Sequence, residues 1–121
     1  MLSIAFCDDE PIMLEELFNV VKGYIDSKKV EFTADLFESG EEFVEKGVRC
    51  RKYDIVFLDI EMKEMNGLEA AAWFRKLNEQ SKVIFVSSHV EYTLDAFKVA
   101  AFRYIIKNKD TMTQAVQEAL D

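Results

Sequence analysis

Five residues of types that can do chemistry each follow a short apolar run in this sequence. They are Asp8, Asp9, Asp59, Ser87 and Lys107. Clustered carboxylates repel one another unless a cation joins them, and a hard divalent ion such as Mg²⁺ prefers oxygen ligands. A carboxylate nucleophile, a metal ion and donors for the remaining charge are the parts that phosphoryl transfer needs. That chemistry requires the five side chains to meet in space.

The apolar runs have the length and the β-branched and aromatic content of strands. They cover residues 2–7, 30–37, 53–58, 82–86 and 102–106. Near-continuous apolarity in the third and fourth runs is typical of strands that are covered on both faces. Apolar residues at helical spacing follow four of these runs, all except the second. The stripes are Leu14, Leu17, Phe18 and Val21; Ala70, Trp73, Phe74 and Leu77; Val90, Leu94 and Phe97; and Met112, Ala115, Val116, Ala119 and Leu120.

Two local signals place helix starts. Pro11 suits the first helical turn, and the segment from Ser39 to Glu42 has the spacing of a capping box that opens a short second helix.

Five strands that alternate with five helices predict an α/β fold with a doubly wound parallel sheet. Its length of 121 residues fits one domain, 1–121, and we expect the flavodoxin-like strand order 2-1-3-4-5. In a parallel sheet the carboxyl ends of all strands share one edge. This order therefore gathers the chemically capable residues in one crevice.

The predicted strand order assigns roles to these residues. Asp59 is the best nucleophile candidate, because its strand lies between those that carry the acidic pair and the hydroxyl. We expect Asp9 and Asp59 to ligate Mg²⁺ directly and Asp8 to do so directly or through water. A backbone carbonyl near Glu61 could complete the protein's share. Three carboxylates, one Mg²⁺ and the Lys107 ammonium balance to zero charge.

Each of these residues also has an ordinary structural role open to it. Asp8 or Asp9 could cap the helix that begins near Pro11, and a lone Asp after a strand is a common turn residue. Ser87 could cap a helix, and Lys107 could be a solvated side chain. The coincidence of the right residue type at the end of each strand favours the chemical interpretation.

These residues and their surroundings resemble the response regulator receiver (CheY-like) family over essentially the whole chain. The matching segments are CDDE, VFLDIEMKEMNGLE, VIFVSSH and YIIK. The resemblance implies acidic Mg²⁺-site residues at Asp8 and Asp9, a phosphorylated Asp59, a switch hydroxyl at Ser87, a phosphoryl-contacting Lys107, a Tyr104 whose rotamer follows activation, and modulators of dephosphorylation at Glu61 and His89.

The resemblance also implies partners. A sensor histidine kinase would phosphorylate Asp59, and the face built from the fourth helix, fifth strand and fifth helix would form a homodimer or bind a partner. The segment SSHVEYTLDAFKVAAFRYIIK is similar to receivers that carry a C-terminal LytTR-type DNA-binding domain. We therefore expect a fragment of a transcriptional regulator that contacts DNA only through a domain absent here.

One position departs from the family pattern, which usually has a proline, often in a cis bond, after the lysine of the fifth strand. Here Asn108 follows Lys107. A cis bond before a non-proline residue costs about 2.5–4 kcal/mol. We expect either a strained cis bond or a rearranged loop. The direction in which the Lys107 side chain points depends on which of the two forms.

Composition bounds the remaining function classes. A formal charge of -8 makes this segment a poor nucleic-acid binder. Cys7 and Cys50 show no metal-ligand or disulfide spacing and suit a reducing compartment. No apolar run could span a bilayer, and the start resembles neither a signal peptide nor an anchor. We expect a soluble, cytoplasmic switch that does not turn over a substrate.

Three rival functions stay open on the sequence. A haloacid-dehalogenase-type Mg²⁺-dependent phosphohydrolase also uses an Asp at a strand end, but Glu61 replaces its second Asp. A flavodoxin-like cofactor binder would need a phosphate-cradling glycine loop, which is absent. A receiver-like module that docks without being phosphorylated is the third. His89 has no nucleophile motif beside it, so a hydrolytic triad is not expected.

Overall fold

Strands and helices alternate along the chain, as the sequence pattern predicts. The strands are β1 (Leu2–Cys7), β2 (Phe32–Phe37), β3 (Ile55–Leu58), β4 (Lys82–Ser87) and β5 (Arg103–Ile106). The helices are α1 (Pro11–Ser27), α2 (Gly40–Glu45), α3 (Gly67–Leu77), α4 (Thr93–Lys98) and α5 (Met112–Leu120), and a short 3₁₀ helix covers Gly47–Lys52. This computed structural model describes residues 1–121 without a gap.

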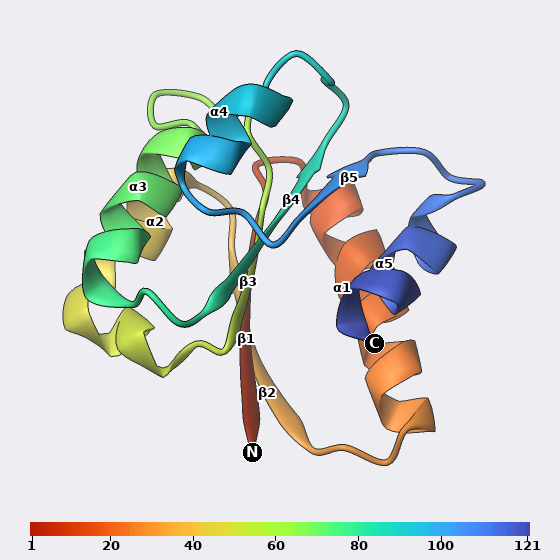
Figure 1. The fold of residues 1–121 in the computed structure, drawn as a ribbon. Helices are drawn as coiled ribbons and strands as arrows, with labels where there is room; N and C mark the ends of the chain where they lie inside the picture. The colour runs from red at the N-terminus through yellow and green to blue at the C-terminus, as the bar shows by residue number, and fades with distance from the viewer.

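All five strands pair in parallel in one sheet with the order β2-β1-β3-β4-β5 (Figure 1). The register pairs Cys7 of β1 with Leu58 of β3, and Leu58 with Phe85 of β4. The predicted fold class and strand order are therefore confirmed. The register sets the ends of β1, β3 and β4 side by side, where the chemically capable residues begin.

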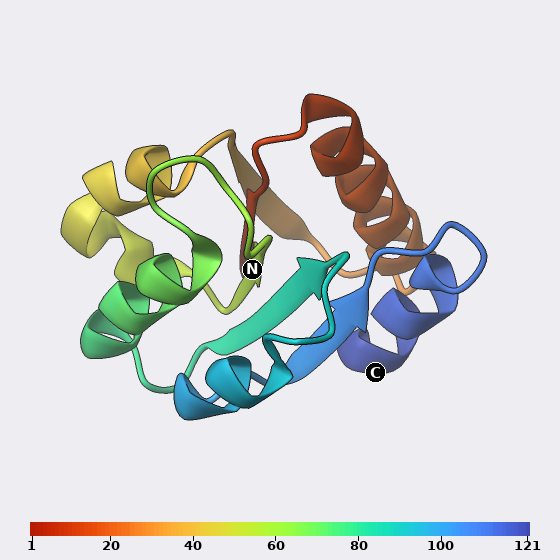
Figure 2. The same cartoon turned by 90° about the horizontal axis from the view of Figure 1, so that it is seen from above.

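Helices cover the sheet on both faces (Figures 1 and 2). On one face α1 and α5 pack around Phe6 and Phe57, whose rings stack with centroids 5.2 Å apart. On the other, α2, α3 and α4 pack around a second apolar cluster that includes Phe43 and Phe74. All residues of β3 are buried, as expected for a central strand covered on both faces.

Capping residues mark the starts of α2 and α3, but the complete capping box lies at α3 and not at α2, where the sequence predicts it. Pro11 occupies the first turn of α1 as predicted. Ser39 caps α2 by accepting a hydrogen bond from the Glu42 amide at 3.1 Å, which is half of the expected capping box. The complete reciprocal box lies at α3, between Asn66 and Glu69. It fixes where the loop after β3 ends.

The apolar stripe predicted for the fourth helix does not pack into the core. Leu94 and Phe97 are 79% and 82% exposed, and Val90, at 64%, precedes the helix. The six-residue α4 buries Ala96 instead. Because α4 is short, only one narrow side of the helix contacts the sheet, and its larger side chains face solvent.

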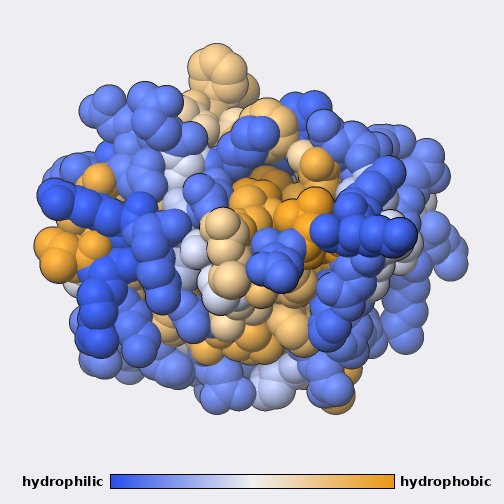
Figure 3. Space-filling model, turned by 90° about the horizontal axis from the view of Figure 1, so that it is seen from below, coloured by the Kyte–Doolittle hydropathy of each residue, from blue (hydrophilic) through white to orange (hydrophobic).

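Few features at the opposite end of the molecule suggest chemistry. Figure 3 looks onto that end and shows apolar atoms near the centre, surrounded by hydrophilic side chains. A hollow of about 570 Å³ is lined mainly by apolar side chains of α1 and the edge strand β2, among them Phe18, Phe32 and Leu36. None of the helices has both the length and the apolar character that crossing a bilayer would require.

Candidate functional site

Carboxylate side chains converge at the carboxyl ends of β1 and β3. Asp8, Asp9, Glu10 and Asp59 each offer an oxygen atom, and these atoms lie within 4.8 Å of one another. Asp8 and Asp59 are 2% and 4% exposed, whereas Asp9 is half-buried and Glu10 is exposed. Buried carboxylates at this spacing require a compensating cation. Four oxygen donors suit a hard divalent ion such as Mg²⁺, so the residues present fit the metal that the sequence implies.

Lys107 reaches this cluster from the end of β5. Its ammonium nitrogen lies 3.0 Å from Asp8 Oδ2, 3.3 Å from Asp59 Oδ2 and 3.4 Å from Glu10 Oε1. The Lys107 side chain is only 9% exposed. It is therefore not a solvated surface lysine, which was its ordinary structural role open on the sequence. Lys107 supplies the positive charge that the acidic cluster lacks.

The pKa values of Asp8, Asp59 and Lys107 reflect both burial and the charges of their neighbours. Burial, followed by the charge of Asp8, raises the pKa of Asp59 to about 7, although Lys107 acts in the opposite direction. Burial likewise raises the pKa of Asp8 above its ordinary value. Burial alone would lower the pKa of Lys107, but the Asp59 and Asp8 carboxylates raise it overall. A second cation is therefore needed to keep both aspartates fully ionised at neutral pH.

Local backbone geometry aims the two buried aspartates. Asp8 Oδ1 accepts a hydrogen bond from the Glu10 amide at 2.9 Å. This bond closes a tight turn that precedes α1, so Asp8 does not act as the N-cap of that helix. Asp59 Oδ1 accepts one from the Ile60 amide at 2.8 Å. Each aspartate thus has one oxygen held by the backbone and the other directed to Lys107.

The glycine at the start of α3 makes this turn possible. A Cβ atom on Gly67 would lie 1.9 Å from the Asp59 carbonyl oxygen, closer than any real contact. The Gly67 amide also donates to the Ile60 carbonyl at 2.9 Å. The chain after β3 can therefore fold back tightly against Asp59 only with glycine at this position.

Ser87 and Tyr104 lie on the β4 and β5 side of the same edge. Ser87 is fully buried at the end of β4, and its Oγ accepts a hydrogen bond from the His89 amide at 3.1 Å. It does not cap α4, which has no side-chain cap. The half-buried Tyr104 donates its hydroxyl to the His89 carbonyl. Both residues contact the loop between β4 and α4 rather than the acidic cluster.

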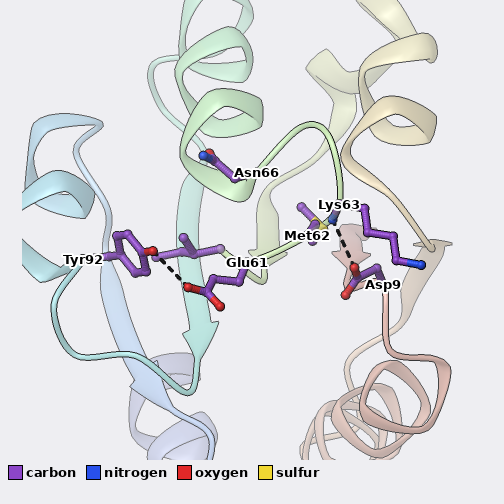
Figure 4. Close-up of a pocket in the computed structure, with 7 residues that line it drawn as sticks. Asp9, Glu61, Met62, Lys63, Asn66 and Tyr92 are labelled. Carbon is purple, nitrogen blue, oxygen red and sulfur yellow. Dashed lines mark hydrogen bonds between the residues drawn. The ribbon is translucent and has the colours of Figure 1, made fainter.

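Glu61 and His89 meet across the mouth of the site. His89 Nε2 lies 2.8 Å from Glu61 Oε2. The Tyr92 hydroxyl donates a hydrogen bond to Glu61 Oε1 at 2.9 Å (Figure 4). The Glu61 carboxylate thus points away from the acidic cluster, toward the β4–α4 loop. A hollow of about 460 Å³ separates Glu61 from Asp9, whose Oδ2 accepts a hydrogen bond from the Lys63 amide at 3.2 Å (Figure 4).

The loop after β5 takes the rearranged form of the two that the sequence allows, since no peptide bond is cis. Asn108 organises a turn, with its side-chain oxygen accepting from the Asp110 amide at 2.9 Å and its carbonyl accepting from the Met112 amide at 2.9 Å. The strained cis bond is not formed. Lys107 reaches Asp8 and Asp59 without it.

Two contributors to the site have no role assigned to them from the sequence. Glu10 adds a fourth carboxylate and a third partner for Lys107, and its place directly after the acidic pair is the signal that could have found it. Tyr92 bonds to Glu61 from 31 positions away. No spacing in the sequence connects those two residues.

Comparison with known proteins places this fold and site in a family. The family model of the response regulator receiver domain matches residues 4–117, so the chain belongs to this family. Receiver domains of this family are in general signalling modules rather than enzymes. The match gives no support to the phosphohydrolase alternative.

Relatives within that family include two-component regulators of the LytR and LytT type. Transcriptional regulatory protein LytR of Staphylococcus aureus is 31% identical over 103 residues, which are 83% of this chain and 39% of LytR. Sensory transduction protein LytT of Bacillus anthracis is 35% identical over 112 residues, which are 91% of this chain and 43% of LytT. The chain spans about two fifths of the length of these relatives.

Solved structures agree on the fold. Response regulator protein TrrA of Thermotoga maritima, in complex with Mg²⁺-BeF, is 30% identical with a TM-score of 0.68 and covers 98% of this chain and 99% of its own. The response regulatory domain of mrkE from Klebsiella pneumoniae has a TM-score of 0.79 at 21% identity, over 98% of this chain and 95% of its own. At 21% identity, the similarity to the mrkE domain shows only that the fold is shared.

Proposed function

We propose that Asp59 is the phosphoacceptor of this receiver domain. The observation that carries the proposal is the burial of Asp59 beside Asp8, with Lys107 paired to both carboxylates. Asp59 has one oxygen held by the Ile60 amide, which leaves Oδ2 as the nucleophilic atom. The Lys107 ammonium lies 3.3 Å from that oxygen, where it can stabilise charge on a transferred group.

The donor in this proposal is a phosphohistidine on a sensor histidine kinase. Asp59 Oδ2 attacks phosphorus, and a P–O bond forms as the P–N bond breaks. The electron pair of the broken bond leaves with the imidazole, which takes a proton from water. The product is an acyl phosphate on Asp59 that water later hydrolyses.

The acidic cluster is the proposed Mg²⁺ site. Asp8, Asp9 and Asp59 would hold the ion through carboxylate oxygens, and Glu61 through its backbone carbonyl. When bound, Mg²⁺ supplies positive charge beside the phosphoryl oxygens. The complex of TrrA with Mg²⁺-BeF and the four converging carboxylates here support this assignment.

Phosphorylation would act as a switch through β4 and β5. The added negative charge and acceptor oxygens attract the Ser87 hydroxyl and the Lys107 ammonium. Ser87 and Tyr104 both bond to His89, so a movement of Ser87 is passed to the β4–α4 loop and to Tyr104. The population then shifts toward a form with a changed α4–β5–α5 face.

That face is the proposed surface for a homodimer or another partner. Leu94 and Phe97 on α4 are largely exposed, and Ile106 of β5 is 37% exposed. Burying such side chains against a second copy would be favourable. Output would be transcription through a LytTR-type DNA-binding domain, as the name of the relative LytR suggests. A cytoplasmic location belongs to the proposal and suits the unpaired Cys7 and Cys50.

A mass-spectrometric assay tests the function. The protein is incubated with Mg²⁺ and acetyl phosphate, and we expect one phosphate adduct that is stable in acid and labile in base. Asp59→Asn should form none, whereas the exposed control Asp110→Asn should react as the wild type does. No adduct on the wild type, or an undiminished adduct on Asp59→Asn, would favour a docking module that is never phosphorylated.

A further inference from the structure

Glu61 bridges the two loops that flank the proposed phosphoacceptor. From the loop after β3, its carboxylate accepts the Tyr92 hydroxyl at 2.9 Å and pairs with His89 Nε2 at 2.8 Å. The His89 and Tyr92 rings meet edge to face with centroids 6.0 Å apart. We call Glu61, His89 and Tyr92 the Glu61 clasp. It joins the β3–α3 loop to the β4–α4 loop.

The clasp is fastened to the residues of the proposed switch. The His89 amide donates to Ser87 Oγ at 3.1 Å, and its carbonyl accepts the Tyr104 hydroxyl. Consecutive links therefore run from Ser87 through His89 to Glu61. A displacement of Ser87 toward Asp59 either breaks its hydrogen bond with His89 or moves His89 with it, and both outcomes disturb the support of the clasp.

The clasp also borders the hollow beside the metal carboxylates. This hollow of about 460 Å³ is lined by Asp9 and Lys63 on one side and by Glu61 and Tyr92 on the other (Figure 4). The pKa of the Tyr92 phenol is raised because its hydroxyl donates to Glu61. Because the carboxylate is charged, this hydrogen bond is of the stronger, charge-assisted kind.

Phosphorylation works against the clasp. A phosphoryl group on Asp59 adds negative charge near the loop that carries the Glu61 carboxylate, and like charges repel. The same group attracts Ser87, to which His89 is bonded. The clasp therefore suits the unphosphorylated arrangement, and phosphorylation favours its opening.

We propose that Tyr92 is a positioning residue that acts through Glu61: it holds the β4–α4 loop in the unphosphorylated arrangement and thereby slows phosphorylation of Asp59. This inference rests on the proposed function. An interaction made in the ground state and lost before the transition state raises the barrier to the forward step. Hydrolysis starts from the phosphorylated protein, in which the clasp is already open, so its rate should not depend on Tyr92.

Tyr92→Phe tests the inference because it removes one hydroxyl and keeps the ring. With acetyl phosphate and Mg²⁺, we expect phosphorylation about two- to fivefold faster than in the wild type, the range of one modest hydrogen bond. The rate of hydrolysis after removal of the donor should stay unchanged. Tyr24→Phe is the matched control. Tyr24 lies near the carboxyl end of α1, and its hydroxyl donates a hydrogen bond to Asp121. Both the phosphorylation rate and the hydrolysis rate of this variant should equal those of the wild type.

A double-mutant cycle shows whether the effect passes through Glu61. In the Glu61→Ala background, Tyr92→Phe should have no further effect on phosphorylation. An unchanged rate in Tyr92→Phe, an equal acceleration of hydrolysis, or additive effects in the double variant would overturn this inference alone. A wild-type protein that accepts no phosphoryl group would overturn both this inference and the proposed function.

Discussion

Replacing Asp59 with asparagine should stabilise the metal-free protein, although it removes the proposed reactive group. The pKa of Asp59 is raised from 3.8 to about 7, first because of burial and then because of Asp8. The residue is only 4% exposed, so solvent screens this cost little. An ionisation displaced that far costs the folded protein about 4 kcal/mol at pH 8.

Asparagine keeps the geometry while it removes the charge. Its side-chain oxygen can still accept from the Ile60 amide, as Asp59 Oδ1 does. Lys107 loses one partner but keeps Asp8 and Glu10. We therefore expect a net gain on the order of 2–3 kcal/mol in the free energy of unfolding of Asp59→Asn at pH 8 without metal.

The sign of the pH dependence follows from the raised pKa. Between about pH 4 and pH 7 the unfolded chain releases its Asp59 proton first, so the wild type loses stability as the pH rises, and the loss is complete above pH 7. The advantage of Asp59→Asn should grow over the same window. Saturating Mg²⁺ should cancel it, because an ion at 100 times its Kd stabilises the folded wild type by about 2.7 kcal/mol.

Urea unfolding at pH 5 and pH 8, with EDTA and with Mg²⁺, measures these differences. Asp110→Asn, which neutralises an exposed carboxylate, should stay within about 0.5 kcal/mol of the wild type in every condition. The reasoning would be refuted if Asp59→Asn were less stable than the wild type at pH 8 in EDTA. It would also be refuted if its advantage were the same at both pH values.

Three further predictions concern packing and the surface. Gly67→Ala should destabilise the fold by about 2 kcal/mol or more, because its Cβ would collide with the Asp59 carbonyl; Gly23→Ala, with open space in α1, should stabilise by about 0.5–1 kcal/mol in the same urea assay. Arg75→Gln should cost about 1–3 kcal/mol in thermal unfolding, because the guanidinium donates to carbonyls after α4 and before β4. Phe97→Asp should leave stability within about 0.5 kcal/mol, since this side chain is 82% exposed, but it should abolish any Mg²⁺- and acetyl-phosphate-dependent dimer seen by sedimentation.

The fold was predictable because alternating apolar periodicities determine a doubly wound sheet, and the sheet determines which residues share an edge. The same logic correctly brings Asp8, Asp59 and Lys107 together at one edge of the sheet. It failed for α4, where Leu94 and Phe97 repeat at helical spacing but face solvent. Periodicity shows which residues share a side of a helix, and it does not show whether that side meets the core.

Contacts between loops were not predictable for a related reason. The bond from Tyr92 to Glu61 depends on how two irregular segments fold over the sheet edge, and neither segment has a periodicity. The Lys107–Asn108 segment shows the same limit. The sequence left two backbone geometries open there, and the turn organised by the Asn108 side chain decided between them.

Locating the phosphoryl group is the measurement that tests the central claim most directly. Borohydride reduces an aspartyl phosphate to homoserine, so the protein can be treated with acetyl phosphate and Mg²⁺, reduced, digested and sequenced by tandem mass spectrometry. We predict homoserine at position 59 and at no other aspartate. Homoserine at Asp8 or Asp9, or none anywhere in the treated protein, would contradict the account.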